Sequence, residues 1–293
     1  MKYAWIKKHC DEFAIRSACE TLAVSTSGYY DWRDRKPSKR QERHQRLTTK
    51  IKDVFEKSHN IYGHRKVHGE LQKQAVVCSL ETVRKIMQTQ DLHPQPPRKF
   101  VITTDSNHKF EIADNLLARD FEADRPNQKW VADITYIPTA SGWSYLATVM
   151  DLFGRPIVGW AMSDKIDTDL TLKALDMAIK RRSPGKNIIF HSDRGVQYAS
   201  TRHQKRLKLF GMECSMSRKG DCWDNAVMER FFWSLKQEWV YGKEYQNLAE
   251  AKEDVYFYIE MFYNSQRIHQ KLGYLTPAEY EEQYWQCQKT GAA

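Results

Sequence analysis

A single acidic residue interrupts what is otherwise the pattern of a buried β-strand. Asp133 lies within residues 130–137, a run rich in β-branched and aromatic residues that contains no Gly or Pro. Such a run predicts a strand. An ionised carboxylate in a strand costs free energy unless a partner or a function compensates for it. We therefore expect a sheet that carries a functional acid.

Two further acids occur where other elements of the same domain are predicted. Asp193 follows a short apolar run at residues 187–191 and begins a tight turn, so it is expected at the end of a strand. Glu229 lies in residues 225–238, where apolar residues recur at spacings of three and four, which predicts a helix. Any one of them alone could be a solvated surface acid, because the chain has 37 Asp and Glu. Their three contexts together favour a shared site.

The chemistry of such a site follows from its carboxylates. Magnesium is a hard cation that prefers carboxylate and phosphate oxygens. Two such ions about 3.5–4 Å apart can stabilise both the attacking and the leaving oxygen of a phosphoryl displacement. Without a cation, three neighbouring carboxylates would raise one another's pKa. Asp133, Asp193 and Glu229 are therefore predicted to be the catalytic residues and the metal ligands.

Several stretches of sequence carry a family resemblance. They are residues 130–136, 151–160, 191–198, 224–236 and 263–277, with residues 27–32 and 62–67 upstream. These stretches resemble the DDE transposases of insertion sequences, whose core belongs to the retroviral-integrase superfamily. The chain is similar to the second-frame product of elements that have two reading frames.

The resemblance implies a fold, an activity and partners. The fold would be α/β, with a ribonuclease-H-like mixed-sheet core and an all-α, helix-turn-helix-like amino-terminal region. The activity would be metal-dependent cleavage and strand transfer on DNA with two Mg²⁺ ions, for which Mn²⁺ could substitute. The partners would be the inverted-repeat ends of the element, target DNA, further copies of the chain in at least a dimer, and the upstream-frame product. A structure-specific nuclease and a DNA-binding regulator with an inactive core are the alternatives.

The net charge of +9 is unevenly distributed. Residues 1–100 contain 21 Lys and Arg against 11 Asp and Glu, whereas residues 101–293 contain 25 against 26. An amino-terminal basic excess favours a polyanionic partner such as DNA, although solubility alone could also explain it. The sequence has no run of about 18 apolar residues and no signal-peptide pattern at its start. We expect a cytoplasmic, DNA-associated protein without a membrane segment.

The amino-terminal part is predicted to be helical. Helices at residues 14–22 and 25–32, the second with Ser25 as its N-cap, form a helix-turn-helix-like region at residues 1–45. Helices at residues 47–57, 63–73 and 80–90 form a domain at residues 46–92. In the last of these helices Arg84 and Lys85 face away from the apolar stripe and are candidate DNA contacts. A protein-interaction bundle remains the alternative.

Metal binding in this region is not expected. His64 and His68 are spaced as zinc ligands often are, but no paired cysteines follow them at finger-like spacing. The six cysteines include no Cys-x-x-Cys pair and are expected to be reduced thiols.

A proline-rich stretch separates the two halves of the chain. Pro94, Pro96 and Pro97 predict a linker at residues 93–127. The catalytic core is expected at residues 128–240 and a helical extension at residues 241–293. The core should contain strands at 129–138, 143–153, 156–162, 187–191 and 212–216, and helices at 169–182, 200–210 and 223–240. Three consecutive strands followed by alternating helices and strands predict a mixed sheet with helices on its faces.

Neighbours of the three acids complete the predicted site. Lys236 lies seven residues after Glu229 and could bind a phosphate of the transferred DNA end, or it could be solvated. Trp223 and Asn225 could contact DNA or cap the helix, and Arg267 could bind DNA or close the fold.

Asp151 ends a strand and is the rival metal ligand. We place it outside the site, as a turn cap or as a partner of Arg155.

Overall fold

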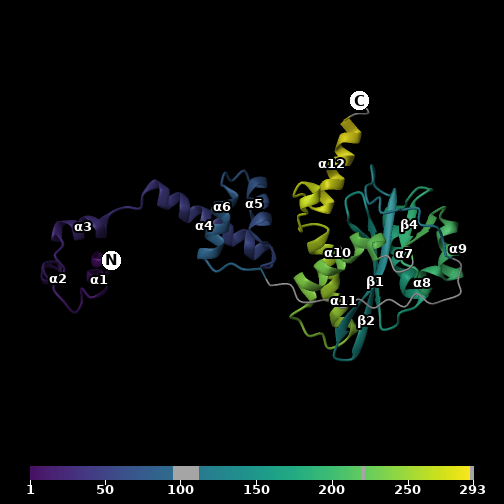
Figure 1. The fold of residues 1–293 in the computed structure, drawn as a ribbon, viewed down its shortest axis with the longest axis horizontal. Helices are drawn as coiled ribbons and strands as arrows, with labels where there is room; N and C mark the ends of the chain where they lie inside the picture. The colour runs from purple at the N-terminus through teal and green to yellow at the C-terminus, as the bar shows by residue number, and fades with distance from the viewer. Residues whose placement is uncertain (95–111, 219–221, 291–293) are drawn as a thin grey trace. The chain divides into compact units, whose positions relative to one another are not determined.

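The computed structural model describes residues 1–94, 112–218 and 222–290 (Figure 1). The chain divides into two units, Met1–Asp53 and Val54–Ala293. Most of the predicted linker, residues 95–111, lies outside the described residues, and residues 112–127 form irregular backbone with turns. None of the described helices has the length and apolar character that crossing a membrane would require.

In the first unit three short helices pack around a small core, and a longer helix follows them. Ile6, Ala18, Cys19 and Tyr29 are its buried apolar residues. Ser25 accepts a hydrogen bond from the backbone of Gly28 and so caps its helix as predicted. The helix at the chain start was not predicted, and the fourth begins earlier than expected and continues into the second unit. The elements are α1 (Lys2–Lys8), α2 (Ile15–Thr21), α3 (Thr26–Asp34) and α4 (Lys39–Lys57).

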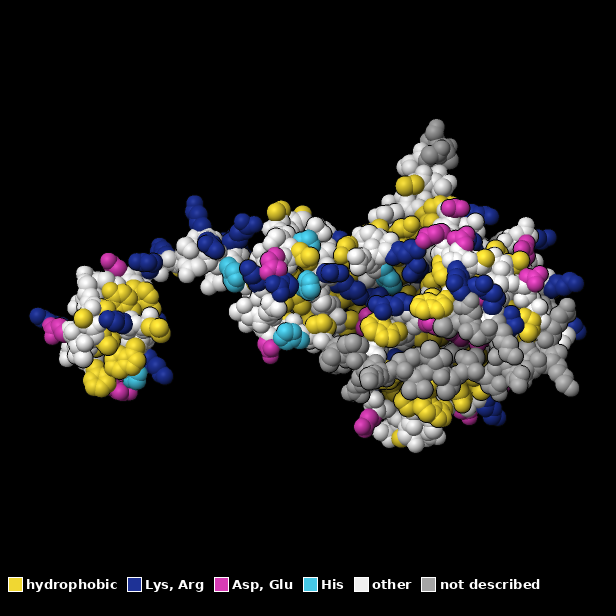
Figure 2. Space-filling model, viewed as in Figure 1, with side chains coloured by type: hydrophobic (Ala, Val, Ile, Leu, Met, Phe, Trp, Pro, Cys, Tyr) yellow, Lys and Arg dark blue, Asp and Glu magenta, His cyan; other side chains and the backbone are white. Residues whose placement is uncertain are grey.

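Basic residues are concentrated on α4, whose Lys and Arg side chains are visible in Figure 2. Two further helices follow, α5 (His64–Lys73) and α6 (Leu80–Thr89). The apolar stripe of α6 is buried, whereas Lys85 is 70% exposed. Arg84 is also partly exposed, and it forms two hydrogen bonds with Glu81. The predicted orientation of both basic side chains is therefore confirmed, and their contact with DNA remains a prediction.

The second unit contains the predicted mixed sheet. Its five strands lie in the order β3-β2-β1-β4-β5. β1, β2 and β3 pair antiparallel, whereas β4 and β5 run parallel to β1. The strands are β1 (Lys129–Thr139), β2 (Gly142–Asp151), β3 (Ile157–Ser163), β4 (Ile189–Ser192) and β5 (Glu213–Met216).

Helices cover both faces of this sheet (Figure 1). On one face α7 (Thr168–Arg182), α8 (Val196–Ala199) and α9 (Thr201–Leu209) enclose the main core, which includes Trp130 and Ala132 of β1. Gly159 lets α7 approach β3, because a Cβ there would lie 2.2 Å from the carbonyl oxygen of Ala174. On the other side α10 (Ala226–Leu235) and α11 (Leu248–Tyr256) contact β1.

The predicted helix over residues 223–240 is a composite. A 3₁₀ turn, η1 (Cys222–Asn225), precedes α10, and a π-helical turn, η2 (Lys236–Val240), follows it. Four of the five residues of η2 are buried, which a regular helix with one buried stripe would not allow. Wider π turns of this kind often occur at functional sites. The remaining elements are a second π turn, η3 (Phe257–Tyr263), a 3₁₀ turn, η4 (Gln270–Leu272), and α12 (Pro277–Thr290).

Candidate active site

Asp133 lies where two strands of the sheet separate. β1 pairs with β2 along nearly its whole length but with β4 only at Lys129–Val131. The β4 side of β1 is therefore open from Ala132 onward. The Asp133 side chain is partly exposed at this opening, and its Oδ1 accepts the backbone N–H of Ile134 at 2.8 Å.

The other two acids come from elements adjacent to this opening. Asp193 directly follows β4, and its Oδ1 accepts the N–H of Gly195 at 2.9 Å. Glu229 lies in the first turn of α10, which contacts β1, and its side chain is partly exposed. The positions at mid-strand, strand end and helix are those that the sequence predicted.

Electrostatics join the three acids into one site. Burial raises the pKa of Asp133 well above its ordinary value, Asp193 raises it further, and Glu229 adds a smaller effect. Partial burial also raises the pKa of Glu229. Asp193 and Glu229 thus lie close enough to oppose the ionisation of Asp133, which a bound cation would relieve.

The donor atoms suit a hard divalent cation, since all are carboxylate oxygens. In the part of the chain that the structure describes, no three His, Cys, Asp or Glu side chains are already gathered tightly enough to hold a metal ion. The acids suit magnesium by the chemistry of their oxygen atoms, and their role as ligands remains a prediction.

Lys236, the first residue of η2, is buried beside the acids. Only 2% of its surface is exposed, and its Nζ lies 4.3 Å from the centre of the Tyr136 ring. Burial lowers its pKa to about 8, while the charge of Asp133 acts in the opposite direction. The alternative of a solvated lysine is therefore wrong. Its contact with a DNA end stays a prediction.

The residues before α10 differ from one another in exposure. Trp223 is 67% exposed, as a DNA contact would require. Asn225 is buried, and its Nδ2 donates to the carbonyl oxygen of Ala132 at 3.2 Å. Its side chain does not cap α10. This corrects the capping role expected for Asn225. The amide that was expected to contact DNA is instead bound to β1 inside the fold.

Arg267 is also corrected as a DNA contact. It is 6% exposed, and its Nε and Nη2 lie 2.6 and 2.5 Å from the two carboxylate oxygens of Glu238. Nη2 also donates to Ser234 at 3.2 Å. This arginine closes the fold by joining the chain after η3 to η2 and α10.

Asp151 is held as a turn cap at the end of β2. Its carboxylate accepts the backbone N–H groups of Asn127 at 2.7 Å and of Phe153 at 3.1 Å. Burial raises its pKa to about 6, and the two backbone hydrogen bonds only partly oppose this. The register places it opposite Trp130, three residues from Asp133 along β1. The turn-cap alternative is confirmed.

Two buried polar residues near the acids were not predicted to have a structural role. Asp224 is fully buried, and Arg218, Arg119 and Asn115 donate to its carboxylate. Hydrogen bonds from Arg218 in particular hold the pKa of Asp224 well below its usual range, against the effect of burial. Both Asp224 and His191 lie in the stretches that carried the family resemblance, and that was the available signal.

His191 lies two residues before Asp193 and is a neutral support for β4. Its two ring nitrogens lie 2.8 and 3.1 Å from the hydroxyls of Ser215 and Ser217. Burial lowers its pKa to about 4. It therefore adds no positive charge beside the acids.

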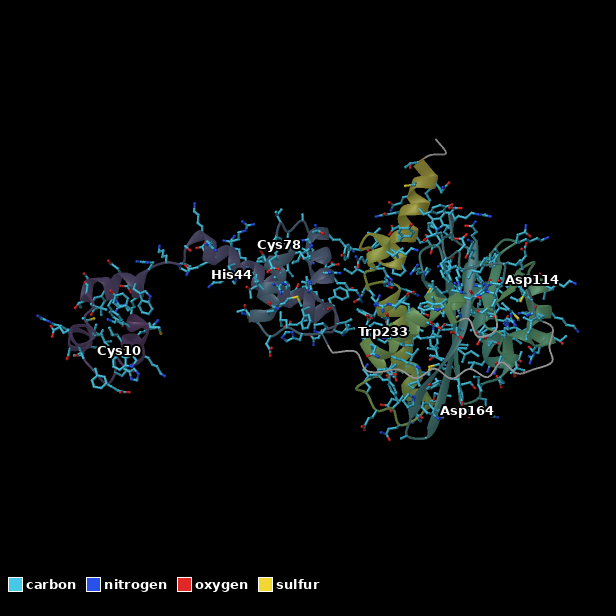
Figure 3. The ribbon with its side chains drawn as sticks, in the orientation of Figure 1. Cys10, His44, Cys78, Asp114, Asp164 and Trp233 are labelled. Carbon is cyan, nitrogen blue, oxygen red and sulfur yellow. The ribbon has the colours of Figure 1, made fainter. Side chains whose placement is uncertain are left out.

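The outer surface of α10 is basic and aromatic next to Glu229. The guanidinium of Arg230 lies 4.2 Å from the centre of the Trp233 ring, which Figure 3 labels on this helix. Cation–π pairs of this kind hold an arginine in place without neutralising its charge. An anionic ligand could approach the acids from this side.

Three family models match the chain. The description "Integrase core domain" applies to matches at residues 123–222 and 210–277, and "HTH-like domain" to residues 42–100. The Transposase InsF for insertion sequence IS3A of Escherichia coli (strain K12) is 40% identical over 283 residues, 96% of this chain and 98% of the relative. The insertion element IS600 uncharacterized 31 kDa protein of Shigella sonnei is 40% identical over 268 residues, 92% of this chain and 98% of the relative.

Among solved structures, the catalytic core domain of BIV integrase is 15% identical, with a TM-score of 0.42. The match covers 56% of this chain and 99% of that one.

Proposed function

The chain belongs to the insertion-sequence transposases that carry an integrase core domain, and we propose that Asp133, Asp193 and Glu229 are its catalytic acids. Family membership makes it a polynucleotidyl transferase of DNA transposition with a ribonuclease-H-like core. The observation that carries the proposal is that β1, its sheet neighbour β4 and α10, which contacts β1, each bring one acid to the same part of the fold. The pKa of Asp133, raised by burial and then by Asp193 and Glu229, supports it, because perturbed acids occur often at functional sites.

In this proposal the three acids hold two magnesium ions, for which manganese can substitute. When bound, these cations supply positive charge to the attacking and leaving oxygens of a phosphodiester. Lys236 keeps a cationic group beside Asp133 and favours the ionised form of that acid. The hydrogen bond from Gly195 orients Asp193, and the one from Ile134 orients Asp133.

The proposed substrate is DNA, at the inverted-repeat ends of the element and at a target site. The HTH-like domain and the basic α4 supply the groups that could bind phosphates. Because two ends must be processed together, the active form would contain at least two copies of the chain. The upstream-frame product is a candidate partner, as a fusion or as a separate chain.

Incubating the protein with labelled element ends and Mg²⁺ tests the function. Cleaved strands and joined products are expected, and both should disappear when the metal is chelated. Cleavage without joined products would favour a nuclease on the same core. DNA binding with neither product would favour a regulator with an inactive core.

A further inference from the structure

Three buried polar atoms without a hydrogen-bond partner lie on elements that adjoin Asp133 or Asp193. Within the described residues they are Thr148 Oγ1, Tyr198 Oη and Asn225 Oδ1. Thr148 pairs directly with Asp133 across β1 and β2. Asn225 holds the carbonyl of Ala132 through its other amide atom. Native proteins rarely leave such atoms unsatisfied, and a bound water or ion is a common explanation.

Of these three residues, Tyr198 lies nearest to Asp193 along the chain. It lies in α8, which begins directly after Gly195, the residue whose N–H binds Asp193. Its carbonyl accepts a hydrogen bond from Gln204 at 2.8 Å, and its ring meets His203 edge to face at 5.3 Å. The first contact holds the backbone of α8, and the second packs against the ring.

Burial and the charges of two acids both act on the hydroxyl. Tyr198 is 2% exposed, and after burial the effects that raise its pKa are the charges of Asp133 and Asp193. Burial lowers the pKa of the adjacent His203 to about 4, so this ring is neutral, and within the described residues both of its nitrogens are also buried without a hydrogen-bond partner. A phenylalanine would fill the same space without burying an unsatisfied group.

We propose that Tyr198 is a positioning residue whose hydroxyl hydrogen-bonds the cation-bound form of the Asp133 and Asp193 pair, through an acid oxygen or a water that the cation retains. The proposal rests on the proposed function, in which these acids hold a divalent cation. Magnesium keeps several of its waters. Groups that bind the ligands or waters of a metal orient them and raise affinity.

Titration of the metal-free full-length chain with Mn²⁺, followed by electron paramagnetic resonance of the free ion, tests the proposal without measuring activity. Tyr198→Phe should weaken Mn²⁺ binding by about 10-fold, with a melting temperature at least equal to that of the wild type. The matched control is Tyr245→Phe. The Tyr245 hydroxyl donates to Asp254 at 2.6 Å away from the acids, so its loss should lower the melting temperature and leave Mn²⁺ affinity unchanged.

Each outcome has one meaning. Unchanged Mn²⁺ affinity in Tyr198→Phe would overturn the inference, and so would a loss of affinity accompanied by a fall in melting temperature as large as that of Tyr245→Phe. Asp133→Asn separates this from a failure of the proposed function. If that variant binds Mn²⁺ as the wild type does, the metal role of the acids is wrong. If it loses Mn²⁺ binding while Tyr198→Phe binds Mn²⁺ with wild-type affinity, only the role of Tyr198 is wrong.

Discussion

The side-chain amide of Asn225 donates a hydrogen bond to the carbonyl oxygen of Ala132 over 3.2 Å. Ala132 immediately precedes Asp133, and Asn225 immediately precedes α10, which carries Glu229. This bond therefore ties the strand with the first acid to the helix with the third. It fixes their relative position without using either carboxylate.

Neutral replacement of each acid should abolish strand transfer. Asp133→Asn, Asp193→Asn and Glu229→Gln remove a metal-ligand charge with little change in volume, so folding and DNA binding should be largely retained. Cleavage and joining of labelled ends measure the activity, and gel mobility of the same ends measures binding. Wild-type joining by any one of the three would contradict the assignment.

Asp151→Asn is the matched control for these variants. It makes the same chemical change in a buried carboxylate that caps a turn, so joining per folded molecule should stay close to wild type. A loss as large as that of Asp133→Asn would place Asp151 in the metal site.

The raised pKa of Asp151 predicts that the stability of the fold depends on pH. Burial raises the pKa of Asp151 from 3.8 to about 6, so the folded chain binds this proton more tightly than the unfolded chain does. The resulting stability is present below about pH 4 and is lost as pH rises through about 6. Asp151→Asn cannot titrate. Its free energy of unfolding relative to wild type should therefore increase by on the order of 3 kcal/mol across this window, at about 1.4 kcal/mol per pKa unit. Urea unfolding at pH 4 and pH 7 measures it, and a constant difference would contradict it.

The sequence predicted the order of strands and helices because their apolar periodicities are strong and local. It also placed each acid in the correct element, since strand, strand end and helix start each have a local pattern. It could not predict the exposure of Asn225 and Arg267, because the partners that bury them lie far away in sequence. Ala132 is 93 residues from Asn225, and Glu238 is 29 from Arg267.

Lys236 shows a second limit of sequence patterns. A helix places this lysine on the same face as Glu229, two turns on. The sequence pattern does not show that this face meets β1, where the Lys236 amine lies over the Tyr136 ring and the side chain is buried. Nor does a local pattern distinguish the π turn that begins at Lys236 from the helix that it continues.

Loss of Arg267 should destabilise the fold and leave DNA binding unchanged. Burial disfavours ionised Glu238, but the charge and hydrogen bonds of Arg267 outweigh it and lower the pKa of that carboxyl. Arg267→Ala leaves this charge without its main partner, so the free energy of unfolding should fall by ~3–5 kcal/mol. Urea unfolding measures the loss. Adding Glu238→Gln should restore part of it, and a stable single variant with weakened DNA affinity would instead support the original DNA role.

Lys85 and Arg84 should contribute unequally to DNA affinity. The Lys85 amine is largely exposed and lies 3.7 Å from Glu81, whereas Arg84 forms two short hydrogen bonds with the same carboxylate. Lys85→Ala should weaken binding to element ends and reduce the slope of log affinity against log salt by about one. Arg84→Ala should do less. Unchanged slopes in both would favour a protein-interaction role for α6.

Lys236→Ala should impair positioning of the cleaved end without abolishing metal binding. The positive charge of the buried amine over Tyr136 lowers the pKa of Asp133. Its removal should therefore raise that pKa further, and it also removes a group that could bind a phosphate. Lys236→Arg should keep part of the joining activity, because the charge remains while its geometry changes.

Lys243→Ala is the control for Lys236, since its amine also lies over an aromatic ring, 4.2 Å from the centre of Trp239, but is bound to Asp254. It should join ends normally. Crosslinking from Lys236→Cys to DNA locates the contact: labelling should be confined to the end of the transferred strand. Labelling of unrelated DNA to the same extent, together with normal joining by Lys236→Ala, would leave Lys236 only as a packing residue of η2.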